Sequence, residues 1–483
     1  MRTQADLHPN FQQGRRNRAA RPILEGLEDR MLLYSVTGDH FTYGSRITWS
    51  IMPDGTNIAG VSSNLVATLN QRLGSNWIGV VNDSFAQWES ITNVNFARVA
   101  DSGAPLASGS YQQGSPDFGD IRIGGFAQGS NVLAFTLYPP PTNGSSSSGD
   151  VVFNSNQQWN IGSNYDLQTV LMHEVGHALG MGHSTDPTAV MYAYYGGVDS
   201  RLNSDDVAGV RSIWGPRAED PVEVNTGNTV SSRAADITGF ITPSNNQAFM
   251  PGLDVANQGE AYWFKITTPS NSTSTFTAQV QSLGLSEFSP RVVIFNASLQ
   301  GLVQTIANAT DYGTTIQATI NNATPNTTYY VKVLGSNNGS TGTGAYALTL
   351  NMGSGSIPIA YPPNTVVAAK LDLGGGYETL TVGGDGSLFK ALALGVDWVS
   401  KLAVEDISSP TTIAALNLLR REISMDSPPL DLIQSQLIGL LQAVPDDSLD
   451  FLLARWGIDE NGSHSPHKLQ MILANYFAEM KAR

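Results

Sequence analysis

Three histidines and one glutamate lie within eleven residues, in the run His173-Glu-Val-Gly-His-Ala-Leu-Gly-Met-Gly-His183. The spacing of four places His173 and His177 on one face of a helix, where both imidazoles can bind a single metal ion. Glu174 follows the first ligand, and its carboxylate can reach a water on that metal. Gly180 accepts a left-handed turn out of the helix, which can bring His183 round as a third ligand. Three imidazoles with one open position predict a catalytic zinc site and not a closed structural one.

The residues around this motif predict the elements that must position it. A helix is expected to begin near residues 163–166, and its buried face to contain Leu167, Val170, Leu171, Val175, Ala178 and Leu179. Residues 60–90 carry an earlier helical pattern that ends at Trp88. Short apolar or alternating segments predict strands at 47–51, 94–99, 120–123 and 132–135. The sequence therefore predicts an α/β domain over residues 39–216, with a mixed twisted sheet and an active-site helix.

The residues after the histidine motif indicate a family. The segment Ser184-Thr-Asp-Pro-Thr-Ala-Val-Met191-Tyr192 resembles the turn of the metzincin metallopeptidases, in which a methionine packs beneath the zinc. Ser184 after the third histidine and Tyr192 after the methionine resemble the matrixin branch, the matrix metalloproteinases. Residues 85–96, 119–123 and 202–215 are similar to that family's first long helix, a following strand and its last helix with paired aspartates. The resemblance covers residues 40–216.

The resemblance implies a zinc-dependent endopeptidase that hydrolyses peptide bonds in protein or peptide substrates. Glu174 would activate a zinc-bound water as a general base and return the proton to the leaving amine. Two alternatives stay open at this point. The chain can be an adhesion or matrix-binding protein with a vestigial peptidase domain, or an enzyme that processes only itself, in the segments 217–235 or 353–365.

Other site residues come from the same resemblance. Met191 would be the packing floor of the site and not a ligand. Val132, Leu133 and Ala134 would belong to the edge strand that lines the cleft, whose backbone would pair with an extended substrate. Tyr195 would lie on the wall of the pocket for the side chain after the scissile bond.

Two departures from the family pattern limit the comparison. Vertebrate matrixins hold a structural zinc with three histidines and an aspartate, but this sequence has no histidine between His40 and His173. Val152 stands where one of those ligands would be expected. The chain also has no cysteine, so a propeptide cysteine cannot occupy the open zinc position. The sequence predicts a single zinc ion and no cysteine latch.

The remainder of the chain predicts separate units. Residues 217–235 are interpreted as a linker, and residues 236–352 as a β-sandwich, from the alternating segments 261–266, 291–295, 328–333 and 344–350. This region resembles the pre-peptidase C-terminal domain of secreted bacterial peptidases. Residues 353–387 are interpreted as a linker with possible strands, and residues 388–483 as an α-helical region of unknown role. The sandwich and the helices are expected to bind a partner or a surface.

Composition excludes some classes of function. The formal net charge of −15 argues against nucleic acid as a partner. The chain lacks an apolar run of about 18 residues, so no transmembrane segment is predicted. An acidic chain suits a calcium-containing environment, and structural calcium is a second expected cofactor. Asp236 and Asp254 are candidate calcium ligands, although solvated loop carboxylates are the favoured interpretation.

The basic N-terminal segment, residues 1–38, is expected to be disordered or to act in targeting. Part of it, residues 21–33, resembles a short segment near the start of many large bacterial surface proteins. A positively charged stretch is present without the apolar stretch of an ordinary signal peptide. The catalytic resemblance and the composition nevertheless predict an exported bacterial protein, extracellular or at the cell surface.

Overall fold

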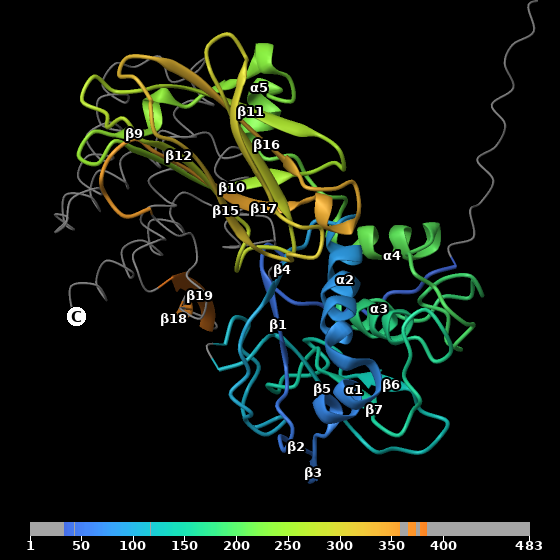
Figure 1. Cartoon of the computed structure of the whole chain (residues 1–483). Coiled ribbons are helices and arrows are strands. Elements are labelled where there is room, and N and C mark those ends of the chain that lie inside the picture. The colour runs from blue at the N-terminus through green and yellow to red at the C-terminus, as the bar shows by residue number, and fades with distance from the viewer. Residues whose placement is uncertain (1–32, 43, 116, 358–365, 373–376, 384–483) are drawn as a thin grey trace, which may run out of the picture.

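The computed structural model describes residues 33–42, 44–115, 117–357, 366–372 and 377–383. Figure 1 shows two bodies of structure: a lower one with a sheet and helices, and an upper one made mainly of strands. The predictions for residues 1–32 and for the helical region 388–483 lie outside the described residues. In the interval 353–387, residues 366–372 and 377–383 form an antiparallel pair of strands, β18 (Val366–Asp372) and β19 (Tyr377–Gly383).

The first body contains a five-stranded sheet in the order β4-β1-β5-β7-β6. All pairings are parallel except that of β6 with β7. The strand bounds are β1 (Ile47–Ile51), β4 (Phe96–Arg98), β5 (Ile121–Phe126), β6 (Ala134–Thr136) and β7 (Val151–Asn154). A small hairpin, β2 (Asn57–Ile58) and β3 (Val61–Ser62), follows β1. The structure therefore confirms a mixed sheet with an antiparallel edge strand.

The edge strand begins later than the sequence predicts. Val132 and Leu133 precede β6, and the strand continues to Thr136. The carbonyl of Val132 accepts hydrogen bonds from the side chains of Asn154 (2.8 Å) and Gln157 (3.2 Å). Because the carbonyl of Val132 is bonded to these side chains, it does not take part in strand pairing, and the regular strand starts at Ala134.

Two helices form the layer that carries the site. The predicted helical pattern over 60–90 divides into α1 (Leu65–Leu73) and α2 (Trp77–Glu89), which are separated by the short helix η1 (Gly74–Asn76). The active-site helix is α3 (Leu167–Ala178), and it lies beside α2 (Figure 1). Asp166 caps α3 by accepting a hydrogen bond from the backbone of Thr169 at 2.8 Å. The predicted buried face is confirmed, since its residues are all buried: Leu167, Val170, Leu171, Val175, Ala178 and Leu179.

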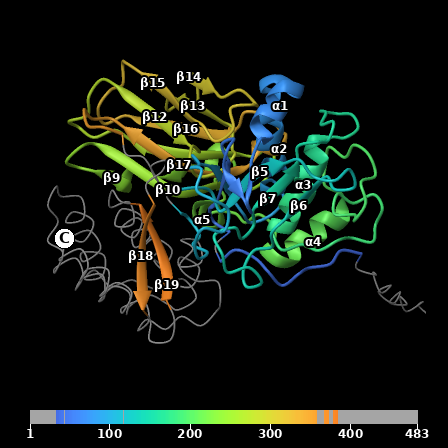
Figure 2. The same cartoon turned by 90° about the horizontal axis from the view of Figure 1, so that it is seen from below.

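The second body contains two five-stranded sheets that share one apolar core, as a β-sandwich does. Figure 2 shows these sheets beside the first body from below. One sheet has the order β15-β12-β17-β10-β9, with β9 (Ile241–Thr242), β10 (Gln247–Val255), β12 (Phe276–Gln281), β15 (Thr315–Ile320) and β17 (Gly344–Asn351). The other has the order β14-β13-β16-β11-β8, with β8 (Ala235–Asp236), β11 (Ala261–Thr267), β13 (Pro290–Phe295), β14 (Gly301–Ile306) and β16 (Thr328–Gly335). The four predicted segments fall in β11, β13, β16 and β17.

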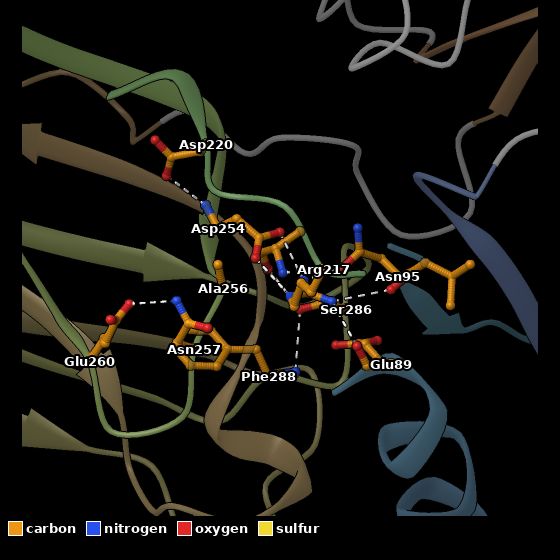
Figure 3. Close-up of polar contacts among 12 residues, drawn as sticks. Glu89, Asn95, Arg217, Asp220, Asp254, Ala256, Asn257, Glu260, Ser286 and Phe288 are labelled. Atoms are coloured by element: carbon orange, nitrogen blue, oxygen red, sulfur yellow. Dashed lines mark hydrogen bonds and ion pairs between the residues drawn. The ribbon is translucent and has the colours of Figure 1, made fainter. Parts of the chain in front are cut away.

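The interval 217–235 connects the two bodies and is itself structured. It includes the short helix α5 (Pro221–Thr226) and a buried arginine, Arg217. Arg217 forms an ion pair with Asp254 of β10 at 2.7 Å and donates to the side chain of Asn95 at 2.7 Å (Figure 3). It also donates to the backbone carbonyl of Glu89 at 3.0 Å. The side chain of one residue therefore bonds to both bodies.

A second contact between the bodies is made by buried carboxyl groups. The carboxylate of Glu89, at the end of α2, accepts hydrogen bonds from the backbone N–H of Phe96 (2.8 Å) and of Glu287 (3.1 Å). The carboxylate of Glu287 accepts a hydrogen bond from the indole of Trp49 at 2.8 Å. Burial raises the pKa of Glu89 to about 7 and the pKa of Glu287 to about 8. The nearby charge of Glu89 also raises the pKa of Glu287, whereas Arg217 partly offsets the effect on Glu89.

These pKa shifts predict a stability that falls as the pH rises. The native state holds protons that the unfolded chain, with an ordinary glutamate pKa of 4.5, releases earlier. Their stabilisation is complete below pH 4.5 and is lost as the pH rises through about 7 to 8. We expect the melting temperature of the full chain to decrease across this window and Glu287→Gln to flatten the decrease. Glu219→Gln, at an exposed position, is the control. An unchanged slope in Glu287→Gln would contradict this assignment.

Candidate metal centre

The histidine motif brings its three side chains to one point. The ligand nitrogens of His173, His177 and His183 all lie within 4.8 Å of one another. His173 and His177 belong to α3, and His183 follows a turn at Gly180, whose φ is +95°. A Cβ at position 180 would lie 2.1 Å from the backbone oxygen of Asp39. The predicted turn is confirmed, and close packing as well as backbone conformation requires the glycine.

The two helical imidazoles are oriented by hydrogen bonds to backbone carbonyls. Nδ1 of His173 bonds to the carbonyl of Val190 at 2.7 Å, and Nδ1 of His177 to the carbonyl of Met181 at 2.8 Å. Because a carbonyl only accepts, each Nδ1 carries the proton and each Nε2 carries a lone pair. Burial lowers the pKa of His173 to about 4 and that of His177 to about 3, so both imidazoles are neutral near pH 7.

The spacing of the two Nε2 atoms fits a bound cation. They lie 3.1 Å apart. Two lone pairs that face each other at this distance repel, unless a cation lies between them. Tetrahedral zinc with Zn–N distances of about 2.0–2.1 Å would place such atoms about 3.3 Å apart. The donor set and its protonation state therefore fit Zn²⁺.

The methionine of the predicted turn packs against the helix that carries His173 and His177. Met191 is fully buried. A Cβ on Gly176 would lie 2.2 Å from the sulfur of Met191 and 3.1 Å from the indole of Trp88. Only glycine at this position of α3 allows the methionine so close to the helix. Met191 thus lies against the ligand-bearing helix, where a packing floor was expected.

The paired aspartates hold the loop that contains Met191. Asp206, buried in the first turn of α4 (Ser204–Trp214), accepts hydrogen bonds from the backbone N–H of Val190 and Met191 at 3.0 Å each. Its neighbour Asp205 accepts from the hydroxyl of Ser184 at 2.6 Å. In the sequence these aspartates are a family feature without a predicted role. The structure shows that Asp206 also fixes the carbonyl of Val190, to which His173 donates.

The predicted general base lies beside the histidines and is buried. Glu174 is 5% exposed, and burial raises its pKa to about 7. Its Oε2 accepts a hydrogen bond from the hydroxyl of Thr136 at 2.6 Å. Sequence reasoning missed Thr136, because it lies 38 residues from Glu174 and belongs to no motif. Only the register of β6 brings the two together.

The residues predicted to bind substrate lie at the edge strand and in the loop after Met191. Leu133 and Ala134 are partly buried and pack on the core of the first body, as does Tyr195. The hydroxyl of Tyr195 accepts a hydrogen bond from the backbone N–H of Asp166, the cap of α3, at 2.9 Å. The ring of Tyr195 lies 5.5 Å from that of Tyr165. Contact of these residues with substrate stays a prediction.

Comparison with known proteins agrees with this geometry. Residues 64–215 match the family model described as Matrixin. Karilysin of Tannerella forsythia is 33% identical over 141 residues, which cover 28% of this chain and 28% of karilysin. Matrix metalloproteinase-16 of Homo sapiens and of Mus musculus are each 33% identical over 156 residues, 29% of this chain and 24% of theirs. The chain thus spans about a quarter of the length of the curated relatives it matches. The similarity to the matrixin family therefore extends over residues 64–215 of the chain.

The absence of a second, structural zinc stays a prediction. Among the residues that the structure describes, His173, His177 and His183 form the one cluster of three or more histidine, cysteine or acidic side chains with converging ligand atoms. Val152, at the position of a family structural-zinc ligand, is fully buried in an apolar cluster. Over the same residues, no helix is long and apolar enough to cross a membrane.

The contacts of Asp206 predict a large effect of its removal. Asp206→Ala removes the acceptor of three backbone amides, the buried ones of Val190 and Met191 and the partly buried one of Asn203. We expect a loss of about 3 kcal/mol in the free energy of unfolding, measured by urea denaturation. Zinc affinity should fall roughly tenfold or more, because the carbonyl that orients His173 is no longer fixed. Asp117→Ala, at an exposed position, is the control; equal stability of the two variants would refute the role of Asp206.

Proposed function

We propose that residues 39–216 form a zinc-dependent endopeptidase that hydrolyses peptide bonds in protein or peptide substrates. The facing Nε2 atoms of His173 and His177, 3.1 Å apart, are the observation that carries the proposal. A buried carboxylate, Glu174, lies next to them in the chain. The match to the matrixin family over residues 64–215 supports the same class of reaction.

The chemistry divides between the metal and the chain. When bound by His173, His177 and His183, Zn²⁺ would lower the pKa of a coordinated water to roughly 7 and polarise the scissile carbonyl. The carboxylate of Glu174 removes a proton from the attacking water and gives it to the leaving nitrogen. The two Nδ1–H bonds keep the helical imidazoles correctly turned, and burial keeps these imidazoles neutral.

The edge strand β6 is the proposed binding site for an extended substrate. In the described structure β6 pairs with β7 on one side and forms the edge of the sheet on the other. A substrate backbone would extend the sheet along this edge, which supplies main-chain hydrogen bonds without a sequence requirement. Tyr195 would line the pocket for the side chain after the scissile bond.

Replacement of the base tests the proposal. Glu174→Gln keeps the shape of the side chain but cannot take a proton, so cleavage of an unfolded protein should fall roughly 10²- to 10⁴-fold. Zinc bound per chain, measured by atomic absorption, should stay the same. Glu219→Gln is the matched control. Full activity of Glu174→Gln would disprove its role. Stoichiometric zinc in a wild-type chain without activity would favour the adhesion or matrix-binding alternative.

Self-processing stays the second alternative. In the interval 217–235 the side chains of Arg217 and Asp220 are buried, whereas Val224 is 61% exposed and Val230 is 48% exposed. The segment 353–365 lies partly outside the described residues. Intact-mass measurement after incubation would reveal fragments that end in either segment.

Structural calcium remains a separate prediction. Asp254 forms a buried ion pair with Arg217 at 2.7 Å, and Asp236 forms an exposed ion pair with Lys265 at 2.8 Å. Asp254 is also buried, which differs from the expected solvated loop residue. If calcium supports the fold elsewhere, a calcium chelator that spares zinc will lower the melting temperature. An unchanged melting temperature would end this expectation.

A further inference from the structure

The hydroxyl of Thr136 makes two contacts with one residue of the active-site helix. It lies 2.6 Å from Oε2 of Glu174 and 2.9 Å from the backbone oxygen of the same residue. Among the described residues, Thr136 is the one side chain that hydrogen-bonds to this carboxylate. A hydroxyl-to-carboxylate distance of 2.6 Å lies in the short range of charge-assisted hydrogen bonds.

The direction of the Thr136 side chain follows from strand geometry. In β6, residues two apart face the same side, so Ala134 and Thr136 share a face and Phe135 points to the other. Phe135 is accordingly 37% exposed. Ala134 has no polar group, so Thr136 alone in β6 brings a hydroxyl to the helix. The β-branched side chain has few χ1 rotamers, which keeps that hydroxyl in place.

A hydrogen bond to the carboxylate of Glu174 restricts the orientations that this side chain can adopt. Glu174 can rotate about three side-chain bonds, and each rotation moves its oxygens relative to the imidazoles. The bond from Thr136 restrains Oε2, so Oε1 would be the oxygen that takes part in the reaction. A fixed base loses less rotational freedom when it reaches the transition state.

We propose that Thr136 is a positioning residue, which holds the carboxylate of Glu174 at a set distance from the strand that receives the substrate. This inference rests on the proposed peptidase function. Because β6 is both the proposed substrate edge and the origin of the hydroxyl, one residue sets the separation between the base and the bound peptide. Thr136 does not itself touch the reacting atoms.

Three substitutions test this role by separating the hydroxyl from the shape of the side chain. Thr136→Val keeps the branched shape and removes the hydroxyl, Thr136→Ser keeps the hydroxyl, and Thr136→Ala removes both. The full chain is assayed for kcat and KM on an unfolded protein substrate, for zinc per chain and for melting temperature. We expect kcat to fall roughly 10- to 100-fold in the valine and alanine variants, with KM within about twofold. The serine variant should retain kcat within about threefold of wild type.

The combination with Glu174→Gln adds a second readout. If Thr136 acts only through Glu174, Thr136→Val should cause no further loss in the Glu174→Gln background. Wild-type kcat in folded Thr136→Val, or equal losses in the valine and serine variants, would overturn the inference while leaving the peptidase function intact. A loss confined to KM would also overturn it. A wild-type chain without any peptidase activity would overturn both proposals.

Discussion

The orientation of two imidazole rings is the constraint on which the candidate site depends. Each Nδ1–H of His173 and His177 donates to a backbone carbonyl, and this turns the Nε2 lone pairs toward a common point. The carbonyls belong to Val190 and Met181, which lie in the loop after α3. That loop is fixed in turn by the carboxylate of Asp206. A metal site with this donor set therefore requires the loop and the first turn of α4 as much as the histidines.

The second body is connected to the same helix through α2. The indole of Trp88 donates to the carbonyl of Met172, the residue before His173, at 3.0 Å. The next residue, Glu89, is the buried carboxylate that contacts the second body through Glu287. Two adjacent residues at the end of α2 thus face the active-site helix and the sandwich. The interval between the bodies is tied to both of them by the side chain of Arg217, which bonds to Asp254, Glu89 and Asn95.

Much of the fold could be predicted from local pattern. The buried face of α3, the strands of both bodies and the order of elements follow hydrophobic periodicity and turn residues, which depend only on near neighbours in sequence. One difference between the predicted and the observed elements arises from contacts with residues that are distant in sequence. The edge strand begins after Val132 because Asn154 and Gln157 occupy its carbonyl. A second difference is local: the helical pattern over 60–90 is interrupted at Gly74, where φ is +65°.

The sequence alone determined the candidate metal ligands, the candidate base and the glycine turn, because a spacing of four on a helix and one positive φ are local properties. Only the tertiary structure decided which side chains form hydrogen bonds to the candidate base and to the other buried carboxyl groups. Thr136 meets Glu174 across 38 residues, and Glu287 meets Glu89 across 198. The sequence spacing does not predict such pairs, because the strand register and the packing of the two bodies bring the residues together. Local sequence thus supplied the reactive groups, and long-range packing supplied their directions.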